Sequence, residues 1–287
     1  MSGVSPLLGV NVVSLAINLP GPLAAARLRS MGATVTKVEP PGGDPLRTVS
    51  EAWYDELTSG QRVVTSDLKS AAGRAALAQE LNGADLLITS MRAAALAKLG
   101  LGRESLAATY PQLSHVEIVG HTGTAAGRAG HDLTYQAEQG TLQPLALPTV
   151  PVVDLLGSER AVSAALVGLM ATARDGRGHH ELIVLEDAAK AAGAAVRHGV
   201  TGVGAPLGGA HPGYRIYPSA DGYVALAALE PHFWERTREA LGVTGTSEEF
   251  TRVFAGKTSS EWESLAASRD IPLAAVREGA HAPGSAK

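Results

Sequence analysis

The sequence predicts an α/β protein with a large N-terminal domain and a smaller C-terminal one, and three observations support this. Short β-branched runs alternate with alanine-rich helical segments over roughly residues 1–200. A glycine-rich stretch at 198–213 is typical of a linker or a long loop. Residues 214–229 follow a strand, turn, strand pattern. We therefore expect a parallel sheet in a large domain over 1–205 and a smaller α+β domain over 206–287.

The clearest local pattern lies in the first forty residues. A β-branched run at 9–17 precedes a segment of helical composition at 23–31, and a second β-branched run follows at 33–38. Pro22 suits the first turn of a helix, where its missing N–H costs nothing. Gly32 suits the left-handed position that ends one. Strand, helix and strand joined by short loops form the unit that builds a parallel sheet.

The same alternation continues along the chain. Strands are expected at 62–67, 84–89, 115–119 and 181–185, and helices at 71–81, 93–99 and 154–174. Parallel strands need crossover connections of this length, so the order of elements favours a parallel sheet. Three more helical segments, at 232–241, 248–254 and 260–268, follow the predicted hairpin.

Composition excludes several classes of protein. The 24 basic residues against 28 acidic ones give a net charge of −4, without the positive field that non-specific nucleic-acid binding requires. The absence of cysteine excludes disulfides, thiolate metal sites and a cysteine nucleophile. The longest apolar stretch, 161–173, is shorter than the roughly 18–20 residues of a spanning helix. With no signal-peptide pattern at the N-terminus, we expect a cytoplasmic protein that binds neither membrane nor nucleic acid.

General motifs for phosphate, metal or nucleophilic sites do not occur. The sequence contains no Gly-x-Gly-x-x-Gly turn between a strand and a helix, no Walker loop and no Gly-x-Ser-x-Gly elbow. His179 and His180 are adjacent, would point to opposite sides of a strand, and are predicted to be solvent-facing loop residues. We therefore expect no metal site.

Three polar residues are candidates for chemistry. His131 follows a glycine-rich segment, Asp154 precedes the longest predicted helix, and Glu230 closes the second hairpin strand. Each could be an ordinary capping or loop residue; for Asp154, capping the helix would contribute about 1 kcal/mol. A carboxylate at that position would also face backbone N–H groups and the positive helix end, which would hold it ionised and oriented.

Taken together, these segments resemble a known family. The matching residues at the N-terminal side are 7–10, 20–22, 32–33, 37–42, 62, 67–69, 92 and 99–102, and they resemble the class III CoA-transferase family. Gly130-His131-Asp132-Leu133-Thr134-Tyr135 and Leu229-Glu230-Pro231-His232-Phe233 are similar to its α-methylacyl-CoA racemase branch. The resemblance implies a Rossmann-like large domain, a small domain and an interlocked homodimer. It also implies a C-terminal return segment, which this sequence is expected to lack.

The resemblance implies a reaction as well. The substrate would be an acyl-CoA, in which coenzyme A is part of the substrate, with no permanently bound cofactor. His131 and Asp154 would flank the carbon next to the thioester, and Glu230 would support the histidine. Racemisation removes a proton from one face of that carbon and returns one to the other, so it needs two bases. We therefore expect a 2-methylacyl-CoA racemase or epimerase.

Two alternatives remain open at this point. In a CoA-transferase, Asp154 would attack the thioester as a nucleophile and His131 would not be required. In a non-catalytic homologue, the fold and dimer would persist while acyl-CoA binding would be weak or absent. For binding of coenzyme A, the resemblance points to Arg92, Thr65, Ser66, Asp67, Leu68, Gly130 and Tyr135.

Overall fold

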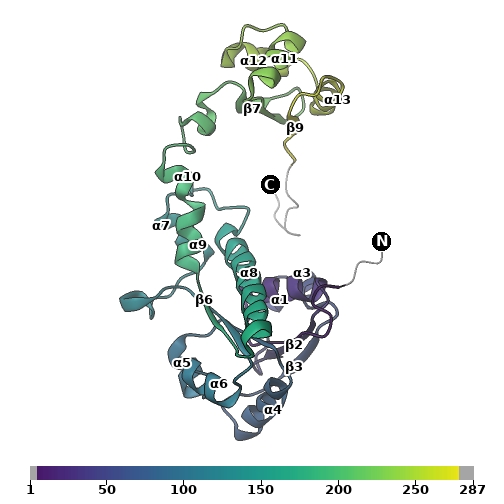
Figure 1. Cartoon of the computed structure of the whole chain (residues 1–287). Coiled ribbons are helices and arrows are strands. Elements are labelled where there is room, and N and C mark those ends of the chain that lie inside the picture. Colours follow the sequence, from purple (N-terminus) through teal and green to yellow (C-terminus); the bar gives the residue numbers. More distant parts are fainter. Residues whose placement is uncertain (1–4, 278–287) are drawn as a thin grey trace. The chain divides into compact units, whose positions relative to one another are not determined.

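The computed structural model describes residues 5–277 and divides the chain into two compact units (Figure 1). The first unit ends at Gly193 and the second begins at Ala194. The glycine-rich stretch 198–213 therefore belongs to the second unit. Within residues 5–277, no helix is both long and apolar enough to cross a bilayer.

The first unit is built on a six-stranded sheet. Its strands are β1 (Asn11–Ser14), β2 (Thr34–Glu39), β3 (Arg62–Thr65), β4 (Leu86–Thr89), β5 (Ser114–Val119) and β6 (His180–Val184). Every neighbouring pair is parallel, in the order β3-β2-β1-β4-β5-β6. This is the order of a Rossmann-like doubly wound fold, whose chain reverses direction across the sheet between β1 and β4. The predicted α/β class is confirmed.

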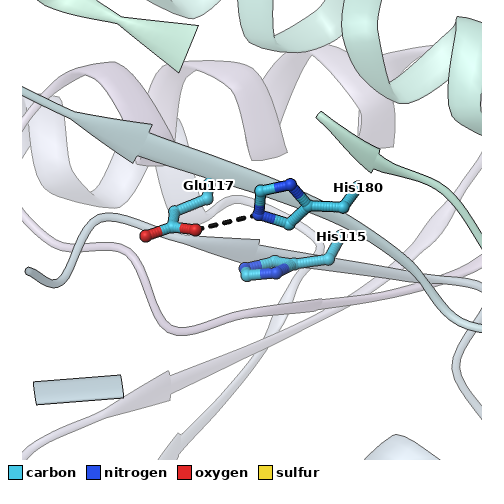
Figure 2. Close-up of side chains that lie close together, drawn as sticks. All are labelled: His115, Glu117 and His180. Carbon is cyan, nitrogen blue, oxygen red and sulfur yellow. Dashed lines mark hydrogen bonds and ion pairs between the residues drawn. The ribbon is translucent and has the colours of Figure 1, made fainter. Parts of the chain in front are cut away.

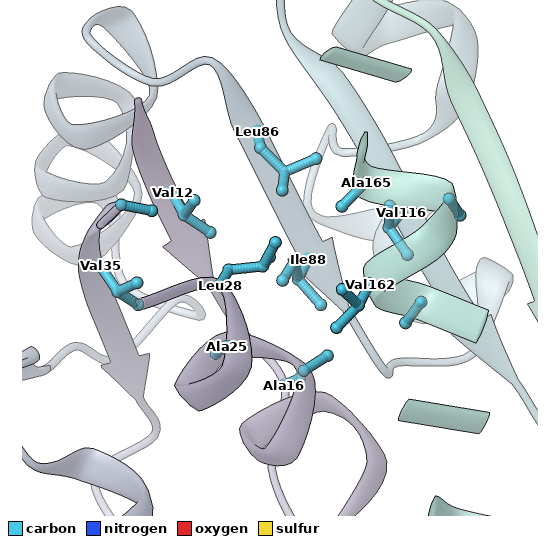
Figure 3. Packing of buried hydrophobic residues seen from close by; sticks show 14 of the residues in the cluster. Val12, Ala16, Ala25, Leu28, Val35, Leu86, Ile88, Val116, Val162 and Ala165 are labelled. Carbon is cyan, nitrogen blue, oxygen red and sulfur yellow. The ribbon is translucent and has the colours of Figure 1, made fainter. Parts of the chain in front are cut away.

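Helices cover both faces of this sheet. They are α1 (Pro20–Ser30), α2 (Pro45–Val49), α3 (Glu51–Thr58), α4 (Ala71–Asn82), α5 (Ala93–Lys98), α6 (Arg103–Thr109), α7 (Asp132–Glu138), α8 (Val152–Asp175) and α9 (Leu185–Ala192), with a 3₁₀ turn at Gly123–Ala125. Successive strand residues point to opposite faces. Val12 and Ile88 accordingly pack with Leu28 of α1 and with α8, as Figure 3 shows. Val13 and Leu87 pack on the other face with α4, α5 and α6.

The second unit carries a small antiparallel sheet. It contains β7 (Tyr214–Pro218), β8 (Tyr223–Ala227) and β9 (Leu273–Ala275), in that order. Its helices are α10 (Ala194–Arg197), α11 (Pro231–Leu241), α12 (Ser247–Phe254) and α13 (Ser259–Arg269), with an irregular turn at Pro206–Ala210. An aromatic core of Tyr217, Phe250, Phe254 and Trp262 joins sheet and helices. The predicted hairpin and three helices are confirmed, and β9 is an additional strand.

Candidate active site

Two adjoining cavities open at the carboxyl ends of the parallel strands of the first unit. One has a volume of about 490 Å³ and the other about 800 Å³, within the range of small-molecule sites. Both are lined by Ile17 and Asn18, which follow β1, and by Ser90 and Met91, which follow β4. This is the point where the strand order reverses, the usual ligand position in open α/β sheets.

The cavities collect most of the residues singled out from the sequence. The smaller cavity, called the acid cavity below, is lined by His131, Asp154, Arg92, Gly130 and Tyr135. The larger cavity is lined by Ser66, Asp67 and Leu68. Thr65 is the last residue of β3 and lines neither of these two cavities. Glu230 is an exposed residue of the second unit that precedes α11, and its support of His131 stays a prediction.

Asp154 lies in the first turn of α8, but it does not cap that helix. The helix begins two residues earlier, at Val152. Its free N–H groups are taken by Asp132, whose Oδ1 accepts from the backbone N–H of Val153 at 2.7 Å and of Asp154 at 3.2 Å. The alternative in which Asp154 is only the cap of α8 is therefore wrong, because a carboxylate from α7 already fills that role. Within residues 5–277, the Asp154 carboxyl group has no hydrogen-bond partner.

The environment of Asp154 raises the pKa of its carboxyl group. Burial disfavours the charged form, and the negative Asp132 nearby adds to this, so the pKa rises from an ordinary 3.8 to about 7. The expectation that helix N–H groups hold Asp154 ionised is thus also wrong. The donors that would have done so are bound to Asp132. A carboxyl group with a pKa near 7 can both take and give a proton at neutral pH.

His131 is held by the backbone of the turn that begins α7. Its N–H donates to Thr134 Oγ1 at 3.0 Å, and its carbonyl accepts from the same hydroxyl at 2.8 Å. The imidazole is exposed. Asp132, whose carboxylate caps α8, is the residue that follows His131 in the chain. The two candidate bases are therefore positioned by one short segment.

Tyr135 of α7 packs against two glycines that line the acid cavity. Its buried hydroxyl lies so close to Gly120 and Gly130 that a Cβ atom on either glycine would meet it at 2.3 or 2.4 Å. Burial, followed by the negative Asp154 nearby, raises the pKa of Tyr135. The phenol thus stays protonated at neutral pH, as a neutral group beside Asp154. Glycine is required at both positions by this close approach.

A second histidine of the acid cavity was not anticipated from the sequence. His121 follows β5, is 4% exposed, and its ring lies 5.3 Å from that of Tyr135 between centroids. Its Nδ1 lies 3.0 Å from Glu186 Oε2, and Glu186 also pairs with Lys190 at 3.1 Å. The sequence feature that could have indicated His121 is its position just after a predicted strand, since the carboxyl ends of parallel strands usually face the ligand.

The loop after β1, which lines both cavities, is anchored from beneath by a buried lysine. Lys37 Nζ donates to Ala16 O at 3.0 Å and pairs with Asp44 Oδ2 at 2.7 Å. Asp44 Oδ1 in turn accepts from the backbone N–H of Asn18 at 3.0 Å. Asn18 has a φ of 68°, a left-handed conformation that asparagine tolerates better than most residues. This network fixes the shared wall of the cavities.

The structure corrects the expectation for His180. This residue lies in β6, with a side chain only 15% exposed, and its Nε2 is 2.9 Å from Glu117 Oε2. His179 precedes the strand, and its more exposed ring pairs with Asp175 at 3.0 Å. The sequence indicated that these histidines alternate, but not that β5 would place a carboxylate against one of them.

Comparison with known proteins identifies the family. The profile described as CoA-transferase family III matches residues 7–284. Succinate–glutarate CoA-transferase of Agrobacterium fabrum is 33% identical over 273 residues, spanning 85% of this chain and 68% of that protein. The alpha-methylacyl-CoA racemase of Homo sapiens is 29% identical over 289 residues, spanning 89% and 74%.

A solved structure gives the same result. The CAIB/BAIF family protein from Brucella suis superposes with a TM-score of 0.79 at 27% identity, covering 95% of this chain and 84% of that one. The profile match extends over nearly the whole sequence, and the similarity of fold extends as far. The chain therefore belongs to CoA-transferase family III.

Proposed function

We propose that this protein is an acyl-CoA-utilising enzyme that moves a proton at the α-carbon of a 2-methylacyl-CoA, with His131 and Asp154 as the two bases. The observation that carries the proposal is that both residues line the acid cavity while the pKa of Asp154 lies at about 7. One group can then accept a proton while the other donates one near neutral pH. His131 also lies in the segment that is similar to the racemase branch.

The proposed reaction needs only the thioester substrate and the two bases. One base takes the α-proton, and the electron pair of the broken C–H bond moves into the thioester carbonyl to give an enolate. The other base returns a proton to the opposite face of the carbon, and the enolate collapses to the thioester. Backbone N–H groups near Gly120 and Gly130, which line the acid cavity, would stabilise the enolate oxygen. Glu230 is proposed to orient the imidazole.

The larger cavity is proposed to hold the nucleotide part of coenzyme A. Lys69 and Lys98 line it, so it offers positive charge for phosphate groups, and the predicted contact segment Ser66–Leu68 lies there too. Arg92 lines the acid cavity next door. The two cavities share four lining residues, so one extended thioester could occupy both. An acyl-CoA bound in this way would place its acyl end near Asp154. A homodimer is proposed on the family resemblance alone.

Transfer of CoA between carboxylic acids is the second candidate, because the 33% identical relative is named as a CoA-transferase. Asp154 would then attack the thioester carbonyl and expel CoA thiolate, giving a mixed anhydride. The thiolate would next attack the aspartyl carbonyl, releasing the first acid and leaving an aspartyl-CoA thioester. The carboxyl group of Asp154 has no protein partner within residues 5–277, which leaves it free for this attack as well.

Incorporation of solvent deuterium into the α-carbon of a 2-methylacyl-CoA distinguishes the candidates. We expect exchange by the wild-type protein, its loss in Asp154→Asn and His131→Gln, and its retention in Asp175→Asn at the other end of α8. Exchange that survives in Asp154→Asn would contradict the mechanism. If hydroxylamine traps an acyl group on Asp154 and CoA moves between acids, the transferase is correct. No activity in either assay would favour a non-catalytic homologue.

A further inference from the structure

Three side chains with metal-binding groups meet on the sheet of the first unit (Figure 2). His115 and Glu117 are two residues apart on β5, so they project from the same face. His180 of β6 is the direct register partner of His115. One ligand atom from each residue lies within 4.8 Å of the others. Glu117 and His180 also line the acid cavity.

The hydrogen bonds of this cluster leave one buried nitrogen without a partner. His180 Nε2 and Glu117 Oε2 are 2.9 Å apart, and His115 Nε2 is 2.8 Å from Thr89 Oγ1. The other nitrogen of His115, Nδ1, is buried and has no hydrogen-bond partner within the described residues, although His115 is only 3% exposed. Buried polar atoms are usually satisfied, so an unpartnered one points to a missing ligand.

We propose that His115, Glu117 and His180 form a binding site for a divalent transition metal of the zinc class, with a coordination position open to the acid cavity. Two imidazoles and one carboxylate are a donor set that suits zinc and its neighbours. Three protein ligands leave a fourth position for water or a substrate oxygen, as in zinc sites that carry out chemistry. The ion would also compensate the buried negative charge of Glu117, which is 8% exposed.

Thr89 supplies the outer contact that such a site needs. Metal-binding histidines usually engage their second ring nitrogen with a protein group, which fixes the ring and leaves the first nitrogen free for the ion. Thr89 is fully buried and holds His115 Nε2 in this manner. It comes from β4, the strand next to β5, so the contact is built into the sheet. The cluster thus has three ligands and one supporting group from three adjacent strands.

Titration of the metal-free, tag-free full-length protein with Co²⁺ tests the proposal. We expect one ion per chain, detected by visible absorption and by calorimetry, and displaced by Zn²⁺. His180→Asn and Glu117→Gln should abolish the absorption band, whereas His179→Asn, which removes the neighbouring half-buried imidazole, should retain it. Thr89→Val keeps the volume of the buried residue and is expected to weaken Co²⁺ binding by about 10–100-fold.

Circular dichroism melting of each variant shows whether it is folded. If His180→Asn does not fold, the Co²⁺ affinity of Thr89→Val tests the metal site instead. A wild-type protein that takes up no Co²⁺ or Zn²⁺ at micromolar concentration would overturn the proposal. So would equal binding by Thr89→Val and the wild type, or by His180→Asn and His179→Asn. Because the readout is metal binding, failure here leaves the proton-transfer proposal to its own test.

Discussion

Replacing Asp154 by asparagine is expected to stabilise the first unit above neutral pH while abolishing proton exchange. The carboxyl group is half-buried beside Asp132 and has no hydrogen-bond partner within residues 5–277. An amide of the same shape carries no charge, so it avoids both the cost of burial and the repulsion by Asp132. Residues placed for chemistry often destabilise the fold in this way.

The expected magnitude follows from the pKa. In the unfolded chain the Asp154 carboxyl group titrates near 3.8, and in the folded chain near 7. Between these values the folded state keeps a proton that the unfolded state releases, so rising pH favours unfolding. The shift of about three pKa units, at about 1.4 kcal/mol each, corresponds to about 4 kcal/mol. Partial solvent contact lowers the expectation to about 2–4 kcal/mol above pH 7 and to nearly zero below pH 4.

Urea unfolding of Asp154→Asn and wild type at pH 4, 6 and 8, followed by circular dichroism, measures this difference. The asparagine variant should gain stability over the wild type steadily as the pH rises. Asp175→Asn is the matched control, since Arg177 N–H and His179 lower the pKa of that exposed carboxyl group and no gain at high pH is expected. An Asp154→Asn variant that is no more stable than wild type at pH 8 would refute the reasoning.

Two further variants test the surroundings of Asp154. Gly130→Ala would place a Cβ atom 2.4 Å from the Tyr135 hydroxyl, so it should lower the melting temperature and the exchange rate, whereas Gly127→Ala, with no atom within 4 Å of its new Cβ, should change neither. Asp132→Asn keeps an oxygen to cap α8 but removes the charge that helps raise the pKa of Asp154. The pH–rate profile of exchange should therefore move to lower pH in this variant, and an unchanged profile would show that burial alone sets the pKa.

The fold could be predicted from short sequence patterns because each strand–helix–strand unit is determined by residues that are close together in the chain. The segment from β1 through α1 to β2 was recognisable from Pro22, Gly32 and two β-branched runs. Since parallel strands require crossover helices, repeating that unit leads to a doubly wound sheet. The small strand β9 was not predicted, because three residues before the C-terminal end carry too little alternation to identify a strand.

The site was less predictable because its contacts are not local. His131 and Asp154 were singled out by their positions along the chain, but their roles as a pair of bases came from the family resemblance. The cap on α8 comes from Asp132, 22 residues before Asp154, whereas capping rules look only at adjacent residues. The pairs of His121 with Glu186 and of His180 with Glu117 span more than 60 residues and depend on how β5 and β6 align. No window along the sequence contains both members of either pair.

Asp132 links these observations. It accepts two N–H groups of α8 through one oxygen, and Gln136 donates to its other oxygen at 2.6 Å. Its charge helps raise the pKa of Asp154, and its backbone continues directly from His131. Asp132 therefore caps α8 and raises the pKa of Asp154, and it follows His131 directly in the chain. Because these residues all belong to the first unit, the pairing of His131 with Asp154 at one cavity does not depend on where the second unit lies.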